Sequence, residues 1–336
     1  MPRDSSPVPD ASNDDADPLH HADVEVHVLN VGQGSCTVIL GPHGRVSVVD
    51  GGDERAWPGR IDATTWLRRA GVTHVDALVL THLHRDHAQG LLAVAREFPV
   101  GVAHLPYGRF ARPEPGADWL VGFERNADVD SPHGQFQLVT EYLDLLTILG
   151  DGGTDIRTWD ASPAEELWSD SGWRLDRVHP SANEQTPTAS LVGRLAQAGD
   201  GGLAEILDEL SEGTNDDSAV FVLRADDAAI PPVVISGDQC GSEERWQRIV
   251  DRADAAGCVW ILPHHGAPDG PSAAVAARLE PGMLIASAAS GAAADVTGYW
   301  AELAAATGRP VIATHEYPDG ERHLSRFGRL TVVVGG

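Results

Sequence analysis

Apolar runs of strand length alternate with segments of helical periodicity along most of the chain. Residues 24–31, 36–40 and 46–49 are short runs rich in β-branched residues, and they predict an opening meander of strands. Alternating elements of this kind predict a layered α/β architecture. Further strands are expected at 77–80, 100–105, 219–223, 233–236, 258–262, 283–287, 311–314 and 330–334, and helices at 64–70, 91–97, 140–149, 243–254, 273–279 and 299–306.

Two segments interrupt this regular pattern. Residues 106–172 mix proline, glycine and aspartate, with five aromatic residues before the helical run 140–149, and a segment of that length in a compact domain is often a lid. Residues 184–213 form a second, helical insertion. We therefore expect a single domain over 23–336 with these two insertions. Residues 1–22 are rich in proline, serine, aspartate and asparagine and predict a disordered acidic tail.

Charge and cysteine content narrow the possible functions. The net charge is −26, and all 24 basic residues are arginine. An anionic surface repels nucleic acid and anionic membranes unless a local patch or a bound metal reverses the sign. No run of 18 apolar residues and no signal peptide are seen, and three widely spaced cysteines do not make a disulfide framework. These features predict a protein of the reducing cytoplasm that does not insert into a membrane.

The stretch THLHRDH, residues 81–87, follows a predicted buried strand. His82 and His84 are two positions apart, so on an extended segment they point the same way and can bind one ion. Asp86 and His87 can reach a second ion. The alternative is a polar surface loop that happens to be rich in histidine. Imidazole and carboxylate ligands suit zinc, and also manganese or iron.

This HxHxDH motif resembles that of the metallo-β-lactamase superfamily. The stretches VHVLNVGQGSCTVI and VSVVDGG further resemble the hydrolase domain of the competence protein ComEC and its free-standing relatives. The later segments NDDSAVFVLR, VVISGDQ, ILPHHG and VIATHEYPDG match that group in order and character. The resemblance covers residues 24–105 and 173–334, and it implies a four-layer αββα sandwich.

The resemblance also implies roles for several later residues. Asp238 would bridge two ions, whereas the alternative is an N-cap for the following helix. Adjacent residues of a strand face opposite ways, so only one of His264 and His265 is expected to bind metal. His265 is the favoured ligand, and His264 would either support a ligand from outside the coordination sphere or contact substrate. Asp50 would orient a ligand histidine, or else cap a turn.

The third ligand of the first ion is less clearly indicated. His179 ends a predicted strand and is our choice, while Asn215 and Asp216 lie where other superfamily members have a histidine. The expected metal ligands are therefore His82, His84, Asp86, His87, His179, Asp238 and His265, and the expected catalytic side chains are Asp86, Asp238 and His264.

These ligands predict a hydrolase with two divalent ions, zinc first and manganese as the alternative, that uses a metal-bridging hydroxide. The expected substrate is a phosphodiester, either a small one or a single-stranded nucleic acid, and not a long duplex. The alternatives are hydrolysis of a carbon ester, lactone or lactam, and an effector subunit that is active only with a protein partner. An arginine cluster facing the metals would favour the phosphodiester, a dry apolar pocket the carbon ester, and an occluded cleft the effector.

Overall fold

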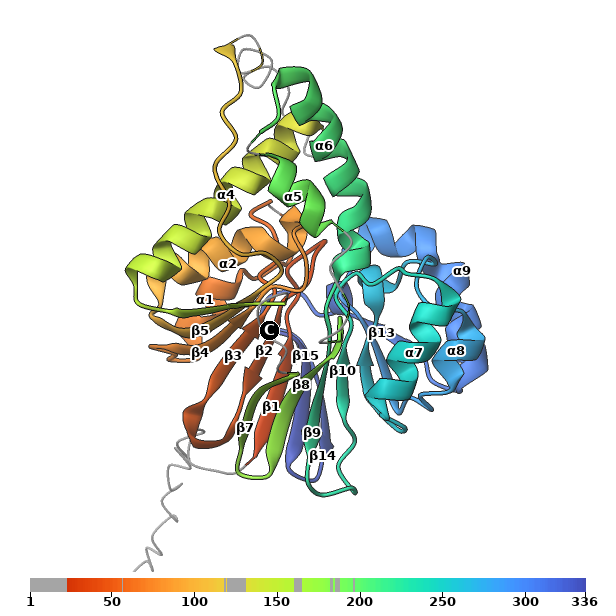
Figure 1. The fold of residues 1–336 in the computed structure, drawn as a ribbon. Helices are drawn as coiled ribbons and strands as arrows, with labels where there is room; N and C mark the ends of the chain where they lie inside the picture. Colours follow the sequence, from red (N-terminus) through yellow and green to blue (C-terminus); the bar gives the residue numbers. More distant parts are fainter. Residues whose placement is uncertain are drawn as a thin grey trace, which may run out of the picture.

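Two β-sheets form the centre of the molecule, with helices on their outer sides (Figure 1). The computed structural model describes residues 23–55, 57–117, 119, 131–159, 165–181, 184, 188–195 and 197–336. The predicted acidic tail over 1–22 lies outside these residues. No helix in the described part of the chain has the length and apolar character needed to cross a bilayer.

The first sheet has eight strands in the order β14-β15-β1-β2-β3-β4-β5-β6. Strands β1 to β3 pair antiparallel, as the predicted meander requires, and β3 to β6 pair parallel. The carboxyl ends of β3 and β4 therefore lie together at one edge. The strands are β1 (Val24–Val28), β2 (Thr37–Leu40), β3 (Val46–Val49), β4 (Val75–Val79), β5 (Val100–Leu105), β6 (Asp155–Thr158), β14 (Arg322–Phe327) and β15 (Leu330–Gly335).

The second sheet has seven strands in the order β13-β12-β11-β10-β9-β8-β7. Its strands β10 to β13 are parallel, so the loops after β10 and β11 are neighbours. The strands are β7 (Glu166–Asp170), β8 (Trp173–His179), β9 (Val220–Ala225), β10 (Val233–Ile235), β11 (Val259–Ile261), β12 (Met283–Ala286) and β13 (Val311–Ala313).

Three apolar clusters hold the layers together. Val26, Ile39 and Phe221 belong to the cluster between the two sheets. A second cluster joins the eight-stranded sheet to α1 (Ala63–Arg69), α2 (Arg85–Glu97), α4 (Pro132–Asp151), α5 (Ala189–Leu195) and α6 (Asp200–Gly213). A third joins the seven-stranded sheet to α7 (Glu243–Ala253), α8 (Ala273–Ala277) and α9 (Ser290–Thr307). The expected four-layer αββα sandwich is confirmed.

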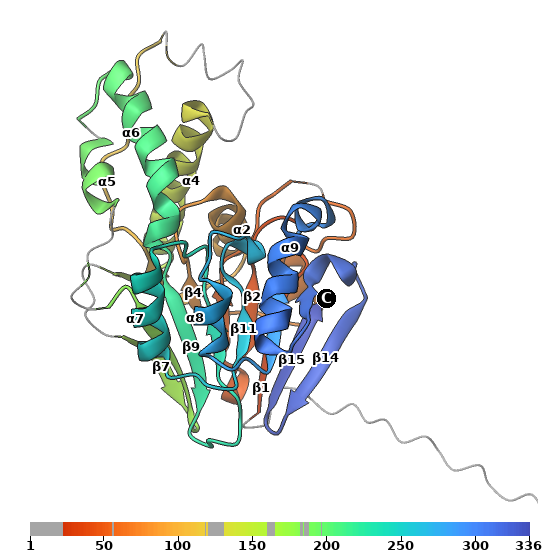
Figure 2. The ribbon, with the colours of Figure 1, turned by 90° about the vertical axis from the view of Figure 1, so that its right-hand side faces the viewer.

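The segments predicted as insertions are partly built into the sandwich. Within 106–172, β6 extends the edge of the first sheet and β7 that of the second, while α4 packs against α2. Within 184–213, α5 and α6 pack against each other, and α6 packs against α4. Figure 2 shows that α4, α5 and α6 project together from one end of the sandwich. This helical projection lies at the end where the histidine motif is found.

Candidate metal centre

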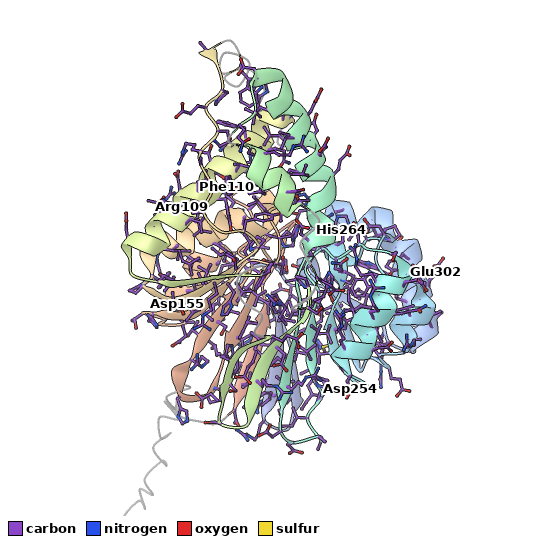
Figure 3. The ribbon with its side chains drawn as sticks, in the orientation of Figure 1. Arg109, Phe110, Asp155, Asp254, His264 and Glu302 are labelled. Atoms are coloured by element: carbon purple, nitrogen blue, oxygen red, sulfur yellow. The ribbon has the colours of Figure 1, made fainter. Side chains whose placement is uncertain are left out.

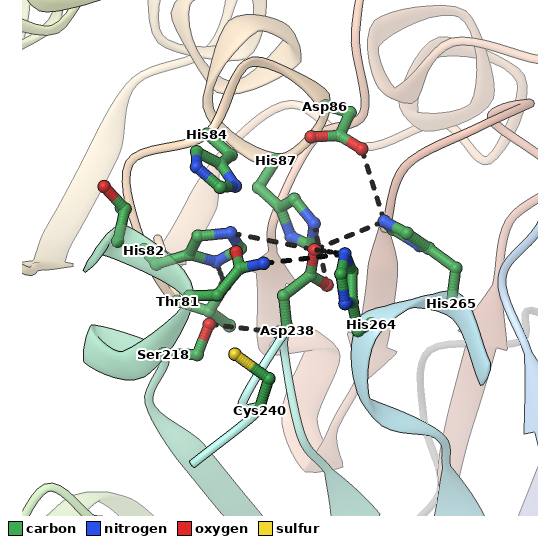
Figure 4. Close-up of polar contacts among 12 residues, drawn as sticks. Thr81, His82, His84, Asp86, His87, Ser218, Asp238, Cys240, His264 and His265 are labelled. Atoms are coloured by element: carbon green, nitrogen blue, oxygen red, sulfur yellow. Dashed lines mark hydrogen bonds and ion pairs between the residues drawn. The ribbon is translucent and has the colours of Figure 1, made fainter. Parts of the chain in front are cut away.

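The histidine motif lies where the carboxyl ends of strands from both sheets meet. The loop after β4 carries His82 and His84, and α2 begins directly afterwards at Arg85. Asp238 follows β10, and His265 follows β11 in the other sheet. The site is thus assembled from three segments far apart in sequence, which is typical of the open ends of parallel strands (Figure 4).

Six of the predicted ligands gather in two groups of three. His82, His84 and Asp238 form one group, and Asp86, His87 and His265 form the other; within each group the ligand atoms lie within 4.8 Å of one another.

Asp238 belongs to the first group but lies on the side that faces the second group. Its Oδ1 is 3.0 Å from His87 Nε2, and its Oδ2 is 3.8 Å from His82 Nε2 and 3.4 Å from His265 Nε2. Its backbone N–H donates to Ser218 Oγ over 3.0 Å, which fixes the residue in place. A carboxylate at this point can contact ions in both groups.

One carboxylate orients two of the histidines. Asp50, fully buried at the end of β3, accepts hydrogen bonds from Thr81 Oγ1 over 2.8 Å and from His87 Nδ1 over 2.8 Å. Because a carboxylate only accepts, the Thr81 hydroxyl donates to it and in turn accepts from His82 Nδ1, 2.9 Å away. In the neutral form of both imidazoles, Nε2 is then the nitrogen without a proton, and it faces Asp238.

Backbone carbonyls orient the other two histidines. His265 Nδ1 donates to Ser287 O over 2.8 Å, and His84 Nε2 donates to Ser211 O near the end of α6 over 3.0 Å. The free nitrogens are consequently Nε2 of His265 and Nδ1 of His84. Metal-binding histidines in proteins are held by this kind of partner on the second ring nitrogen.

The electrostatics of the cluster favour cations. Burial opposes protonation of His265, but the carboxylates of Asp238 and Asp86 raise its pKa to about 10. Burial likewise opposes a charge on His87, yet Asp238 and Asp50 raise its pKa well above the ordinary value. Burial lowers the pKa of His82 well below the ordinary value. The carboxylates therefore attract positive charge to nitrogens for which a divalent ion would compete with protons.

Several buried polar atoms without a hydrogen-bond partner indicate that these residues suit divalent metal ions. Nε2 of His82, His87 and His265 and Oδ1 of Asp238 are buried without a hydrogen-bond partner among the described residues. Unpartnered buried polar atoms are rare, and here four of them converge on one point. Nitrogen and carboxylate oxygen are ligands for zinc, manganese or iron, so the residues present suit two divalent ions.

The local backbone is specialised to bring these segments together. Gly237 has a φ of +51°, and a Cβ added there would lie 2.8 Å from Thr81 Cβ, so glycine allows the loop of Asp238 to approach the histidine loop. Asp50, His264 and His265 also have positive φ values, of 59°, 45° and 56°. Non-glycine residues in this region are costly and often mark functional sites.

A polar pocket of about 220 Å³ opens beside the two groups. Besides ligand residues it is lined by Arg55, Arg85, Gln33, Gln135 and Asn215. Gln135 comes from α4 and Asn215 from the turn after α6, so the helical projection forms part of its wall. Arg55, Arg85, Gln33 and Gln135 were not predicted from the sequence as site residues. Only the position of Arg85 inside the HxHxDH motif could have indicated it.

Two predicted residues lie outside both ligand groups. His264 lines the pocket near the lower end of α6 (Figure 3), with Nδ1 donating to Asp269 Oδ2 over 2.7 Å and Nε2 3.9 Å from Asp238 Oδ2. His179 ends β8, two strands away from β10, and its Nδ1 is 3.4 Å from Glu184 Oε2. The prediction of His179 as a ligand is not supported by this placement, because the sheet order separates it from Asp238.

Asp216, the remaining alternative for the third ligand, and two other residues with possible ligand atoms, His315 and Cys240, have contacts of their own. His315 Nδ1 donates to Ala288 O over 3.1 Å. Cys240 Sγ lies 3.9 Å from Asp216 Oδ1, and Asp216 pairs with Arg245 over 2.9 Å. None of these three side chains belongs to a ligand group in the described part of the chain.

Comparisons with known proteins agree with this geometry. Residues 29–160 match the family model of the Metallo-beta-lactamase superfamily. No curated protein matches the sequence.

Solved structures resemble the chain at low sequence identity. A motif mutant of a metallo-beta-lactamase from Cronobacter sakazakii is 12% identical, with 69% of this chain and 74% of that one covered and a TM-score of 0.33. An archaeal metallo-beta-lactamase superfamily protein from Sulfolobus tokodaii is 14% identical, with coverages of 72% and 80% and a TM-score of 0.34. CmlA, a diiron beta-hydroxylase from Streptomyces venezuelae, is 13% identical, with coverages of 88% and 45% and a TM-score of 0.38.

Residues 29–160 are thus similar to the metallo-β-lactamase superfamily, and the described residues form an αββα sandwich with two groups of side chains that could hold metal ions.

Proposed function

We propose that the protein hydrolyses phosphodiesters with two divalent ions. The observation that carries this proposal is Arg85, whose guanidinium lines the pocket beside both ligand groups and whose Nε is buried without a hydrogen-bond partner among the described residues.

Arg85 has one contact that fixes its direction. Its Nη2 donates to Gly134 O in the first turn of α4 over 3.2 Å. An unpaired buried N–H costs about 1–3 kcal/mol, a cost that an incoming acceptor would offset. The planar guanidinium matches the geometry of phosphate oxygens. A substrate phosphate is therefore the ligand that best completes this arrangement.

A second arginine adds to the positive side of the pocket. Arg55 lines it, and the buried carboxylate of Asp53 holds the guanidinium through Nε. Asp53 also pairs with Arg60, whose Nη1 lies 3.5 Å from Asp53 Oδ1, so the net charge of Arg55, Asp53 and Arg60 is positive. In the pocket wall itself, the positive charges of Arg55 and Arg85 offset the negative charges of Asp86 and Asp238. Bound divalent ions would then make the pocket attractive to an anion although the whole chain is acidic.

The division of work among the side chains follows from their positions. When bound, two divalent ions supply Lewis acidity that activates water and polarises a phosphoryl oxygen. Asp238 and Asp86 provide negative charge that keeps two cations close together. Arg85 binds a non-bridging phosphate oxygen, and His264 presents Nε2 to the pocket from a ring held by Asp269. The ligand histidines are kept in one tautomer by Asp50, Thr81 and the two carbonyls.

The size of the pocket limits the substrate. A volume of about 220 Å³ suits one phosphodiester group with a small substituent or a single nucleotide. A net charge of −26 opposes long duplexes, which bind proteins largely through basic surfaces. We propose a small phosphodiester or a single-stranded end as substrate, with zinc or manganese as the metal, in a cytoplasmic protein that could act with a protein partner.

Hydrolysis of bis-(p-nitrophenyl) phosphate tests the proposal. The protein is reconstituted separately with zinc and manganese, and the rate is compared for the wild type, Arg85→Ala and Arg96→Ala. Arg96 is a matched control because it is an exposed arginine in the last turn of the same helix. We expect Arg85→Ala to lower kcat/KM by about 100-fold, the loss of one charged hydrogen-bonding group, and Arg96→Ala to change it less than twofold.

Two outcomes would overturn the proposal. Equal activity of Arg85→Ala and the wild type would remove the observation that carries it. Hydrolysis of a chromogenic lactam or lactone, with no cleavage of the diester by either metal form, would show that the substrate is a carbonyl compound.

A further inference from the structure

We infer that Asn215 completes the ligand set of the ion held by His82, His84 and Asp238, through its side-chain carbonyl oxygen. This inference rests on the two-metal centre of the proposed function, and it names a ligand that makes the two ion sites chemically unequal.

The two groups differ in the number of their ligands. Asp86, His87 and His265 supply three donors to one ion, and Asp238 adds a fourth from its position between the groups. The other group has His82 and His84, with Asp238 as its third donor. Zinc sites with an open position commonly have three protein ligands. When Asp238 is counted as shared, this group has two ligands of its own, one fewer than the neighbouring group.

Asn215 is placed on the correct side of this group. It lies in the short turn Thr214–Asp217 that continues α6, four residues after Ser211. Residues four apart share one face of a helix, and Ser211 O accepts the hydrogen bond from His84. Asn215 therefore points from the same face toward the same ligand group, and it lines the pocket together with His84 and Asp238.

The hydrogen bonds around His264 set the direction of the amide. Asp269 accepts from His264 Nδ1, so in the neutral ring Nε2 is an acceptor. Asn215 Nδ2 lies 3.5 Å from this Nε2, and it is the only end of the amide that can donate to it. Oδ1, the other end of the same amide, takes no part in this contact.

Asn215 Oδ1 has no other use in the described residues. It is buried and has no hydrogen-bond partner among them. The neighbouring Asp216, in contrast, pairs with Arg245, and His179 lies near Glu184 at the end of β8. Of the three residues considered for the missing ligand, Asn215 alone lines the pocket.

A carbonyl oxygen at this position changes metal preference. Imidazole suits zinc, whereas carbonyl and carboxylate oxygens suit manganese and magnesium better. The ion bound by His82 and His84 should accordingly hold zinc more weakly than the ion bound by Asp86, His87 and His265, and it should accept manganese more readily. The protein would bind its two ions in two distinguishable steps.

Metal-free protein is titrated with zinc chloride or manganese chloride in the presence of a competing chromogenic chelator. This titration measures the affinity of each of the two ion-binding steps without any substrate. Asn215→Ala should weaken the weaker of the two steps by about tenfold or more, at least the loss seen when a hydrogen-bond partner of a metal ligand is removed, and should leave the tighter step unchanged. Asn215→His should tighten zinc at the weaker step and weaken manganese relative to zinc. Asp216→Asn is the neighbouring control and should leave both steps unchanged.

The visible spectrum of the cobalt-substituted protein gives an independent readout. Asn215→Ala should alter the bands of one cobalt ion and preserve those of the other. The inference is wrong if Asn215→Ala binds two ions with wild-type affinities and an unchanged cobalt spectrum. A wild type that binds both ions but cleaves no diester would contradict the proposed substrate and leave this inference standing. A wild type that binds only one ion would overturn the inference about Asn215.

Discussion

Asp50 is the residue on which the orientation of the histidine loop depends. It has a left-handed backbone, is fully buried, and accepts from both Thr81 and His87. Through Thr81 it also sets the tautomer of His82. A single side chain outside the ligand set thus orients a histidine in each ligand group.

Replacing Asp50 by asparagine should weaken metal binding while the protein stays folded. An amide places an N–H where a carboxylate accepts, so the protons on Thr81 and His87 have to rearrange and the imidazole nitrogens that face Asp238 become protonated. We expect zinc affinity to fall by about 10–100-fold. Chelator competition checks this, with Thr81→Ser, which keeps the hydroxyl, as the control. Unchanged affinity in Asp50→Asn would contradict the role of this carboxylate.

Asp238→Asn should lose one ion and most of the diesterase activity. The substitution removes the negative charge that lies between the two groups and lets two cations approach each other. We expect a rate at least 100-fold lower, with elemental analysis showing about one ion per chain. Glu243→Gln, on the first turn of α7 and bonded to Ser272, is the control. Retention of both ions and near-normal hydrolysis would reject the bridging role.

Sequence motifs predict some of these residues and not others. His82, His84, Asp86 and His87 form a compact motif after a strand, which is why their clustering was foreseeable. Arg85 lies within that motif, but arginine is common on surfaces and its buried Nε is visible only once α4 packs above it. The position of His179 outside both ligand groups could not be foreseen for a similar reason, because strand order within a sheet cannot be read from a strand's own sequence.

At the scale of elements, α6 and the turn that follows it connect the helical projection to the sheets. Asp217 in this turn accepts from Tyr107 Oη over 2.6 Å and from the backbone N–H of Thr188 over 3.2 Å. Tyr107 follows β5, and Thr188 immediately precedes α5. These contacts fasten both inserted segments to the sandwich next to Asn215.

Tyr107→Phe should loosen that attachment. Without the hydroxyl, the buried carboxylate of Asp217 loses a donor, and we expect the free energy of unfolding to fall by about 1–3 kcal/mol. Urea denaturation followed by circular dichroism measures the change. Tyr317→Phe gives a comparison at a tyrosine away from this network. A midpoint unaltered in Tyr107→Phe would show that the network adds nothing to stability.

Periodicity located most elements, and its failures have physical causes. Strand β5 begins and ends as predicted, and β3 does too. Strand β14 was missed because it is an edge strand whose exposed positions include Arg322 and Arg326, which break the apolar alternation. Helix α4 starts eight residues before the predicted one, because Ser131 caps it and Pro132 suits its first turn.

For the molecule as a whole, acid should weaken the fold through buried histidines. Burial, assisted by Arg157 and Arg177, lowers the pKa of His104 from 6.5 to about 4. As the pH falls from 6.5 toward 4, His104 binds a proton in the unfolded chain but not in the folded chain. The free energy of unfolding therefore falls in that window, by about 1.4 kcal/mol per unit of pKa difference.

Comparing the wild type with His104→Gln tests this pH dependence. Chemical denaturation at pH 7 and pH 5 should show a smaller loss of stability for His104→Gln than for the wild type. The other buried histidines contribute equally to both proteins, so the difference isolates His104. Identical losses in the two proteins would mean that His104 is protonated as easily when folded as when unfolded.

The candidate metal ligands come from both sheets, with Asp86 and His87 beyond β4 and His265 beyond β11. An ion held by these three residues would link the two halves of the sandwich, much as a disulfide links two strands. When the free ion concentration is a thousand times the dissociation constant, binding of this kind raises the free energy of unfolding by about 4 kcal/mol. Heat resistance should therefore depend on the buffer: dialysis against EDTA should lower the melting temperature by several degrees, and zinc should restore it. Purification on chelating resins would then yield a protein whose two sheets separate more easily.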